Sequence, residues 1–247
     1  MQRYFVDQMS ETQAKILGED VHHITRVMRM SVGDTIYCCY NGRVALCAIT
    51  EITNDMVLAN VVEWVENSNE LPIKVCIASG LPKGDKLEYV IQKGTELGAS
   101  EFVPFVAARS IVKWDEKKGQ KKVERWEKIA KEAAEQSHRA MVPNVSKPMS
   151  FTELLSFSGT YTYKVVAYEE DAKRGENSNL ARVLSQLNHG ESLFVVIGPE
   201  GGLTEKEVDT LLENDFISCS FGPRILRTET APLYVLSAVS YYFELAR

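Results

Sequence analysis

Two loops near the C-terminal end of the sequence hold the residue types that could do chemistry. One loop reads Ile197-Gly198-Pro199-Glu200-Gly201-Gly202, and the other, residues 221–232, contains two arginines, one glutamate and two threonines. Glycine lets the backbone approach a ligand without an intervening side chain. A carboxylate can accept a proton, and a guanidinium can donate to developing negative charge. The two loops therefore predict a ligand held by backbone groups beside acidic and basic side chains.

The residues around the loops indicate the elements that position them. A continuous apolar run at residues 193–197 predicts a strand buried on both faces, and Thr204 with Glu207 forms a capping box that opens a helix. A β-like run at residues 216–221 precedes the second loop and must end at its Gly-Pro pair, because proline cannot donate to a ladder. Both loops are expected at the carboxyl ends of neighbouring strands, where open α/β sheets bind ligands.

The rest of the chain divides into two patterns. After the polar segment 66–72, which we interpret as a linker, strand-like segments at 73–79, 101–106 and 163–168 alternate with helical ones at 85–97, 121–139, 151–156 and 179–187. Such alternation is typical of an α/β fold with a mostly parallel sheet and helices on both faces. Residues 1–70 instead predict short strands around the hairpin turn Asn41-Gly42, with one helix at 19–28. We expect a small barrel at 1–70 and an α/β domain at 71–247.

Composition excludes several classes of protein. No apolar run approaches the roughly 18 residues of a membrane span, and the first ten residues lack the apolar core of a signal peptide, so a cytoplasmic protein is expected. The five cysteines are odd in number and have no C-x-x-C spacing, which predicts neither disulfides nor a metal site. The net charge of −6 means that any contact with RNA must come from local basic patches.

Together the two loops resemble the signature of the RsmE family, the uracil-N3 methyltransferases of small-subunit (16S) ribosomal RNA, which belong to the SPOUT class. The resemblance extends over nearly the whole chain, through the blocks Lys83-Gly-Asp-Lys86, Gln92-Lys-Gly-Thr-Glu-Leu-Gly98 and Glu132-Ala-Ala-Glu-Gln-Ser137. Phe221 and Gly94 depart from the residues common in the family, but neither position is charged. The resemblance implies a PUA-like RNA-binding β-barrel followed by a SPOUT domain threaded as a trefoil knot.

The resemblance also implies S-adenosylmethionine as the cofactor, held mainly by the backbone of three loops. The residues expected to contact it are Ala167, Tyr168, Glu169, Ile197, Gly198, Pro199, Gly201, Gly202, Phe221, Gly222, Ile225, Leu226 and Thr228. A dehydrogenase on a similar sheet is disfavoured, because the G-x-G-x-x-G spacing is missing. A non-catalytic RNA-binding assembly factor stays open as an alternative, although the intact glycines of both loops speak against lost activity.

The chemistry of uracil N3, the implied methyl acceptor, indicates the candidate catalytic residues. Uracil N3 carries a proton at neutral pH, so methylation there needs a base, or donors that stabilise charge on the uracil oxygens. Arg227, with Arg224 near it, could donate to that charge. Glu200 and Glu229 are the candidate bases, and each could equally anchor an arginine or cap a helix.

Basic residues outside these loops are candidates for RNA contact. They are Arg3, His22, Arg26 and Arg29 in the first domain and Arg109, Lys117, Lys118, Lys121, Lys122 and Arg139 in the second. Residues 105–131 contain nine basic and four acidic residues, a local surplus that fits a phosphate footprint but also fits a solubilising charge run. The final helix carries Tyr234, Tyr241 and Tyr242 outside its apolar stripe, which predicts a homodimer.

Overall fold

The structure is a computed structural model that describes residues 1–66, 69–112, 114, 116–168 and 178–246, with only the backbone of 116–118. It forms two compact units. The first unit is Met1–Glu70 with Lys131–Val142, and the second is Leu71–Ala130 with Pro143–Arg247. The domain boundary expected at residue 70 stays a prediction; the first unit also ends at Glu70, and it takes in Lys131–Val142 from the middle of the chain as well.

Six strands form the sheet of the first unit. They are β1 (Arg3–Phe5), β2 (Gln8–Met9), β3 (Gln13–Leu17), β4 (Thr35–Tyr40), β5 (Arg43–Ile52) and β6 (Met56–Val65). Their order is β1-β4-β5-β6-β3-β2, and every pairing is antiparallel except the parallel pair of β1 with β4. The hairpin between β4 and β5 is confirmed: Asn41 and Gly42 have φ values of 49° and 77°, as a type I′ turn requires.

The helix expected at residues 19–28 is present in two parts. α1 (Glu19–His22) continues directly into η1 (His23–Val27), one turn of π-helix. The turn ends at Arg29, whose φ of 53° is left-handed and cannot continue a helix. Val21 and Ile24 point into the core of this unit, together with Tyr4, Ile16 and Ile36.

Polar contacts explain why residues 131–142 belong to the first unit. Lys131 Nζ lies 2.7 Å from Asp20 Oδ2, and the Arg139 guanidinium donates to both carboxylate oxygens of Glu70. Arg3 Nη1 donates to the Arg139 carbonyl at 2.9 Å, and Ala140 packs in a small apolar cluster with Cys39 and Val44 of the sheet. These partners are far apart in the sequence, so no local sequence pattern predicts their contacts.

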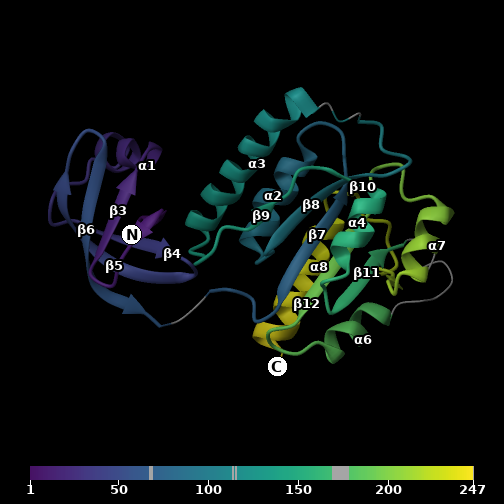
Figure 1. Ribbon diagram of the computed structural model, residues 1–247. Coiled ribbons are helices and arrows are strands. Elements are labelled where there is room, and N and C mark those ends of the chain that lie inside the picture. Colours follow the sequence, from purple (N-terminus) through teal and green to yellow (C-terminus); the bar gives the residue numbers. More distant parts are fainter. Residues whose placement is uncertain (67–68, 113, 115, 169–177, 247) are drawn as a thin grey trace. The chain divides into compact units, whose positions relative to one another are not determined.

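The second unit contains a sheet in which every pairing is parallel (Figure 1). Its strands are β7 (Lys74–Gly80), β8 (Glu101–Val106), β9 (Asn144–Val145), β10 (Met149–Ser150), β11 (Tyr163–Ala167), β12 (Ser192–Ile197) and β13 (Ile217–Cys219). The order is β10-β8-β7-β12-β11-β13, and β9 pairs with β8 beside this path. The expected parallel sheet is confirmed, whereas the trefoil knot is a matter of chain threading and stays a prediction.

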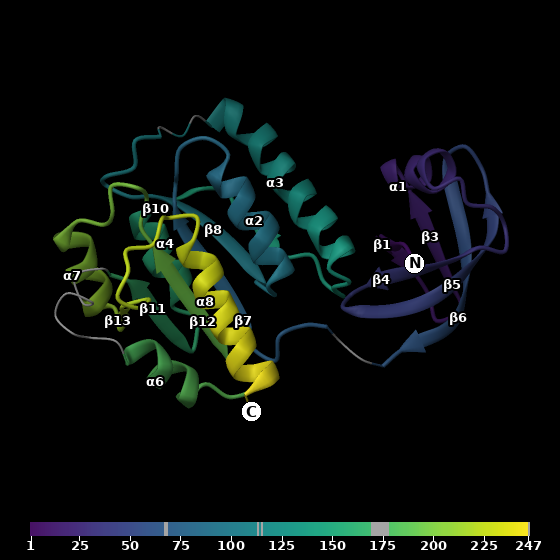
Figure 2. The ribbon, with the colours of Figure 1, turned by 180° about the vertical axis from the view of Figure 1, so that it is seen from behind.

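Helices cover both faces of this sheet. They are α2 (Lys86–Glu96), α3 (Glu116–Gln136), α4 (Phe151–Ser158), α6 (Asn179–Gln186), α7 (Glu205–Glu213) and α8 (Ala231–Ser240), which continues as the π-helix η2 (Tyr241–Leu245). Seen from the two sides, α2 and α8 lie over one face, and α4 and α7 over the other (Figure 1, Figure 2). No described helix is long and apolar enough to cross a bilayer.

Close packing accounts for one departure from the family pattern. A Cβ built on Gly94 in α2 would lie 2.7 Å from the Phe102 ring and 3.4 Å from Leu236 in α8. Alanine at this position would therefore force the buried Phe102 ring to move. The glycine lets α2 lie close to both the sheet and α8.

The charged contacts of the first unit predict a dependence of stability on pH. Burial, opposed by the Lys131 ammonium, raises the pKa of Glu135 from 4.5 to about 7. A raised pKa means that the folded protein binds this proton more tightly than the unfolded chain, so stability falls as the pH rises from about 4.5 to 7. Glu135→Gln should remove this loss and stabilise the protein at pH 8 by on the order of 1 kcal/mol, allowing for partial solvent screening.

Urea denaturation of both proteins at pH 5.5, 7 and 8 measures the effect. The gain from Glu135→Gln should shrink toward pH 5.5. Glu127→Gln, at an exposed position of the same helix whose charge does not act on Glu135, is the control and should not change the pH dependence. A variant with the same pH dependence as the parent protein would contradict the assignment to Glu135.

Candidate active site

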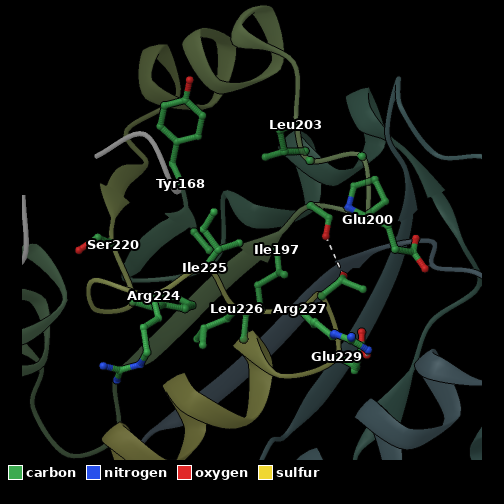
Figure 3. A pocket seen from close by; sticks show the side chains of 18 of the residues that line it. Tyr168, Ile197, Glu200, Leu203, Ser220, Arg224, Ile225, Leu226, Arg227 and Glu229 are labelled. Atoms are coloured by element: carbon green, nitrogen blue, oxygen red, sulfur yellow. Dashed lines mark hydrogen bonds and ion pairs between the residues drawn. The ribbon is translucent and has the colours of Figure 1, made fainter. Parts of the chain in front are cut away.

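A cavity of about 820 Å³ lies in the second unit at the carboxyl ends of three adjacent strands, β12, β11 and β13 (Figure 3). Its walls are Ala167 and Tyr168 after β11, residues 197–203 after β12, and residues 219–229 after β13. The three strands are parallel neighbours, so the chain leaves each of them at the same edge of the sheet. This is the crevice in which open α/β sheets bind ligands.

The cavity brings together the described residues that the sequence predicted for cofactor contact. All thirteen line it except Glu169, which lies outside the residues that the structure describes. The three candidate catalytic residues, Glu200, Arg227 and Glu229, line it as well. Sequence reasoning did not assign the following lining residues to it: Lys86, Arg109, Leu203, Glu205, Cys219, Ser220, Pro223 and Ala231. Those next to the loops could have been found by extending them, but Lys86 and Arg109 come from distant segments.

Hydrogen bonds join the loops to one another. Thr228 Oγ1 donates to the Gly198 carbonyl at 2.8 Å, and this bond ties the loop after β13 to the loop after β12. Arg109 Nη1 donates to the carbonyls of Gly201 and Leu203 at 3.2 and 3.3 Å. Arg109, expected to contact RNA, thus supports the glycine loop at the edge of the cavity.

Glycine is required in these loops for two reasons. Gly202 and Gly222 have φ values of 69° and 82°, in the left-handed region that other residues enter at a cost. Close approach is the second reason, because a Cβ on Gly80 at the end of β7 would lie 2.5 Å from Pro199. The backbone of the first loop can therefore pass directly over the end of β7.

Apolar side chains form part of the cavity wall. Figure 3 shows Ile197, Leu203, Ile225 and Leu226 around its interior, with Tyr168 beyond them. Apolar walls with backbone donors and acceptors at their edge suit a flat heteroaromatic ring with polar atoms on its rim. The site can thus hold a ligand that has both apolar and polar parts.

Charged side chains gather at one side of the cavity. Glu200, Arg227 and Glu229 are labelled in Figure 3. Lys86 Nζ lies 2.9 Å from Glu200 Oε1 and 3.5 Å from Glu229 Oε2, while Arg227 Nη1 reaches Glu229 Oε1 only at 4.0 Å. Burial tends to raise the pKa of Glu200, but hydrogen bonds from Lys86 and from the backbone N–H of Lys83 outweigh it and lower that pKa. The bond to Glu200 in turn raises the pKa of Lys86.

Arg227 and Glu229 differ in how much solvent they meet. The Arg227 side chain is 84% exposed and the Glu229 side chain only 18%. Glu229 Oε2 is buried and accepts no hydrogen bond from the described part of the chain. The geometry thus offers an exposed guanidinium next to a shielded carboxylate, whose Oε2 has an ion pair with Lys86 at 3.5 Å but no hydrogen bond from the described residues.

Comparison with known proteins places this site in a family. A model of the RNA methyltransferase domain matches residues 69–240, and a model of the RNA methyltransferase PUA domain matches residues 16–62. The ribosomal RNA small subunit methyltransferase E of Bacillus subtilis is 57% identical over 100% of this chain and 99% of its own length, and that of Synechocystis is 33% identical over 96% and 76%. The chain belongs to the ribosomal RNA small subunit methyltransferase E family. The resemblance seen in the two loops is confirmed.

Solved structures extend the comparison to the fold. A ribosomal RNA small subunit methyltransferase E from Neisseria gonorrhoeae, crystallised with S-adenosyl methionine, has a TM-score of 0.84 at 26% identity and covers 98% of both chains. A putative methyltransferase from Legionella pneumophila, in complex with the same cofactor, has a TM-score of 0.82 at 26% identity over 96% of both chains. The methyltransferase fold expected for the second unit is therefore confirmed.

The residues expected to contact RNA lie in different environments in this methyltransferase. His22, Arg26 and Arg29 are exposed in the first unit, and Lys121 and Lys122 are exposed on α3 of the second. The side chains of Lys117 and Lys118 lie outside the described part of the structure. The structure contradicts the prediction for Arg139, because its side chain is 3% exposed and bound to Glu70. Arg3, half-buried, lies over the Tyr37 ring and donates to the Arg139 carbonyl, so it too supports the fold.

The bond between Thr228 and Gly198 predicts how the cavity responds to one lost hydroxyl. Thr228→Val keeps the shape of the buried side chain but leaves the Gly198 carbonyl without this donor, a loss of about 1 kcal/mol. If the loops must be joined to bind S-adenosylmethionine, the dissociation constant should rise by about 5-fold.

Isothermal titration calorimetry on the folded variant measures this constant. Thr228→Ser, which retains the hydroxyl, is the matched control and should bind as the parent protein does. Equal affinity of all three proteins would show that the bond between the loops has no role in ligand binding.

Proposed function

We propose that this protein transfers a methyl group from S-adenosylmethionine to N3 of a uridine in 16S ribosomal RNA. The observation that carries the proposal is the cavity at the ends of β11, β12 and β13, with an exposed arginine and a shielded carboxylate on one side of it. Its volume of about 820 Å³ lies within the range of roughly 300–1,000 Å³ that holds small-molecule ligands. The names of the relatives and the cofactor found in two structural neighbours support the proposal.

The residues of the cavity fit the two ends of such a cofactor. Ile197, Ile225 and Leu226 offer the apolar surface that an adenine ring needs, and the backbone of residues 197–203 and 219–222 offers donors and acceptors to its edge. When bound, S-adenosylmethionine supplies a methyl group already activated on a positively charged sulfur. The chain therefore has to orient the two reactants, exclude water and move one proton.

The removal of the N3 proton distinguishes the two candidate bases. Glu200 already accepts hydrogen bonds from Lys86 and from the Lys83 backbone, and these interactions hold its pKa low. A carboxylate stabilised in this way is a weak base. Glu229 Oε2 lies farther from the same ammonium, at 3.5 Å, and accepts no hydrogen bond from the described residues, so we assign proton acceptance to Glu229. Arg227, exposed beside it, would stabilise the negative charge on a uracil oxygen.

Several partners follow from the same proposal. The exposed basic residues of the first unit, His22, Arg26 and Arg29, are proposed to bind the phosphates of the small-subunit RNA, with Lys121 and Lys122 of α3.

Because ribosomal RNA is the substrate, we propose that the protein acts in the cytoplasm. Among the described residues no cluster of histidine, cysteine and carboxylate side chains could hold a metal ion, and no step above requires one.

A direct assay tests the proposed function. Purified protein, S-adenosylmethionine and small ribosomal subunits from cells lacking this methyltransferase should yield one added methyl group on one uridine, measured by mass mapping of the RNA. The same RNA should stop reverse transcription at that position, since N3 methylation blocks the pairing edge. Methylation at another atom, or none, would overturn the proposal.

Arg227 provides the test of the site within this function. Arg227→Ala should bind S-adenosylmethionine within about 2-fold of the parent protein, because its side chain points to solvent, but should methylate RNA about 10²- to 10³-fold more slowly. Arg227→Lys is the matched control: it keeps the charge but lacks the planar fork, and should recover only part of the rate. A parallel loss of affinity and rate would indicate that Arg227 only stiffens the loop.

We also propose a homodimer. Tyr241 and Leu245 in η2 are 63% and 77% exposed, and Tyr234 of α8 is also exposed, which leaves apolar surface suited to a second copy. Light scattering at micromolar concentration should give twice the chain mass, and Tyr241→Glu should lower it. Leu212→Glu, on exposed surface of α7, is the control and should leave the dimer intact. A monomeric parent protein would contradict this proposal.

A further inference from the structure

One lysine outside the two loops contacts both candidate bases. Lys86 is the first residue of α2, and its ammonium lies 2.9 Å from Glu200 Oε1 and 3.5 Å from Glu229 Oε2. Glu200 belongs to the loop after β12, and Glu229 to the loop after β13. The backbone N–H of Lys83 binds the same Glu200 oxygen at 3.1 Å, so the start of α2 approaches this loop through two groups.

This contact differs from an ordinary surface ion pair, which adds little to stability. Two carboxylates share one ammonium, and without it their like charges would repel each other. Glu229 would then keep the Arg227 guanidinium, 4.0 Å away, as its ion-pair partner among the described residues. Among the described residues, Lys86 is therefore the nearer of the two cationic partners of Glu229.

Lys86 is not required to hold the two loops together. The bond from Thr228 to the Gly198 carbonyl already joins the same two loops, and Arg109 supports the first of them from the other side. The Lys86 side chain is 34% exposed, so its removal leaves no buried cavity. Within the described part of the chain, Lys86 alone forms an ion pair with both Glu200 and Glu229.

We propose that Lys86 is a positioning residue for methyl transfer: its ammonium holds the Glu229 carboxylate in the direction in which it accepts the proton of the acceptor nitrogen. This inference rests on the proposed function. The N3 proton passes to Glu229, and the N–H electron pair forms the bond to the methyl carbon while the pair of the methyl–sulfur bond leaves with sulfur. Glu229 ends as a neutral acid, and Lys86 keeps its own proton, because its bond to Glu200 favours the charged ammonium.

Single-turnover methylation of small subunits and calorimetry with S-adenosylmethionine test the role together. Lys86→Met should leave the cofactor affinity within about 3-fold and slow methyl transfer by about 10-fold or more, because misplacing a catalytic group slows the reaction without weakening cofactor binding. Lys86→Arg keeps the charge and should recover most of the rate. Lys93→Met removes another lysine of α2, which pairs only with Glu96 nearby, and should behave as the parent protein.

A double-mutant cycle identifies the residue through which Lys86 acts. If Lys86 positions Glu229, then adding Lys86→Met to Glu229→Gln should change the rate by less than about 2-fold, because the group it serves is already gone. Adding Lys86→Met to Glu200→Gln should still slow the reaction. Should the Met variant fail to fold, Lys86→Gln repeats the cycle with a neutral, polar side chain.

The outcomes separate this inference from the function on which it rests. An unchanged rate in Lys86→Met, or effects that multiply fully with Glu229→Gln, would overturn the positioning role while leaving the methyltransferase assignment intact. A parallel loss of cofactor affinity and rate would overturn it too, in favour of a purely structural lysine. Absence of uridine methylation by the parent protein would instead overturn the proposed function, and this inference with it.

Discussion

The parallel pairing of β11 with both β12 and β13 is the constraint on which the site depends. Val166 pairs with Val196 on one side, and Ala167 with Cys219 on the other, so the three strands end almost level. Their following loops must therefore share one small space above the sheet edge. Glycine backbone and the bond between Thr228 and Gly198 allow the loops to approach closely without filling that space with side chains.

The part of this arrangement that could be predicted from the sequence is the part that is local. The glycine loops, the apolar strand before the first loop and the capping box of Thr204 and Glu207 each lie within a few residues, and the structure contains all of them. Lys86 could not be assigned, because its partner Glu200 is 114 residues away, and neither could the attachment of Lys131 to Asp20 over 111 residues. The prediction that Arg139 contacts RNA failed for the same reason. A basic residue is expected to be exposed, and its distant partner Glu70 could not be recognised from the sequence.

Short strands were missed for a different reason. β2, β9 and β10 contain two residues each, too few to show the alternation by which strands are recognised. Their formation depends on the neighbour that each one finds, as β9 and β10 do along β8. β9 and β10 lie beside β8, away from the cavity, and β2 belongs to the sheet of the first unit, so the site could be located without these strands.

The balance of charge at the cavity explains how an acidic protein could attract an anionic acceptor. Among the described lining residues four are basic and three acidic, a local balance opposite in sign to the net charge of −6. The Lys86 ammonium is bound to carboxylates, and the Arg109 guanidinium is bound to backbone carbonyls. Three of the four cations are exposed: Arg109, which is bound in this way, and Arg224 and Arg227, which both belong to the loop after β13. An anion would therefore be drawn toward the same loop that carries Glu229, while the backbone-lined part of the cavity stays available for the methyl donor.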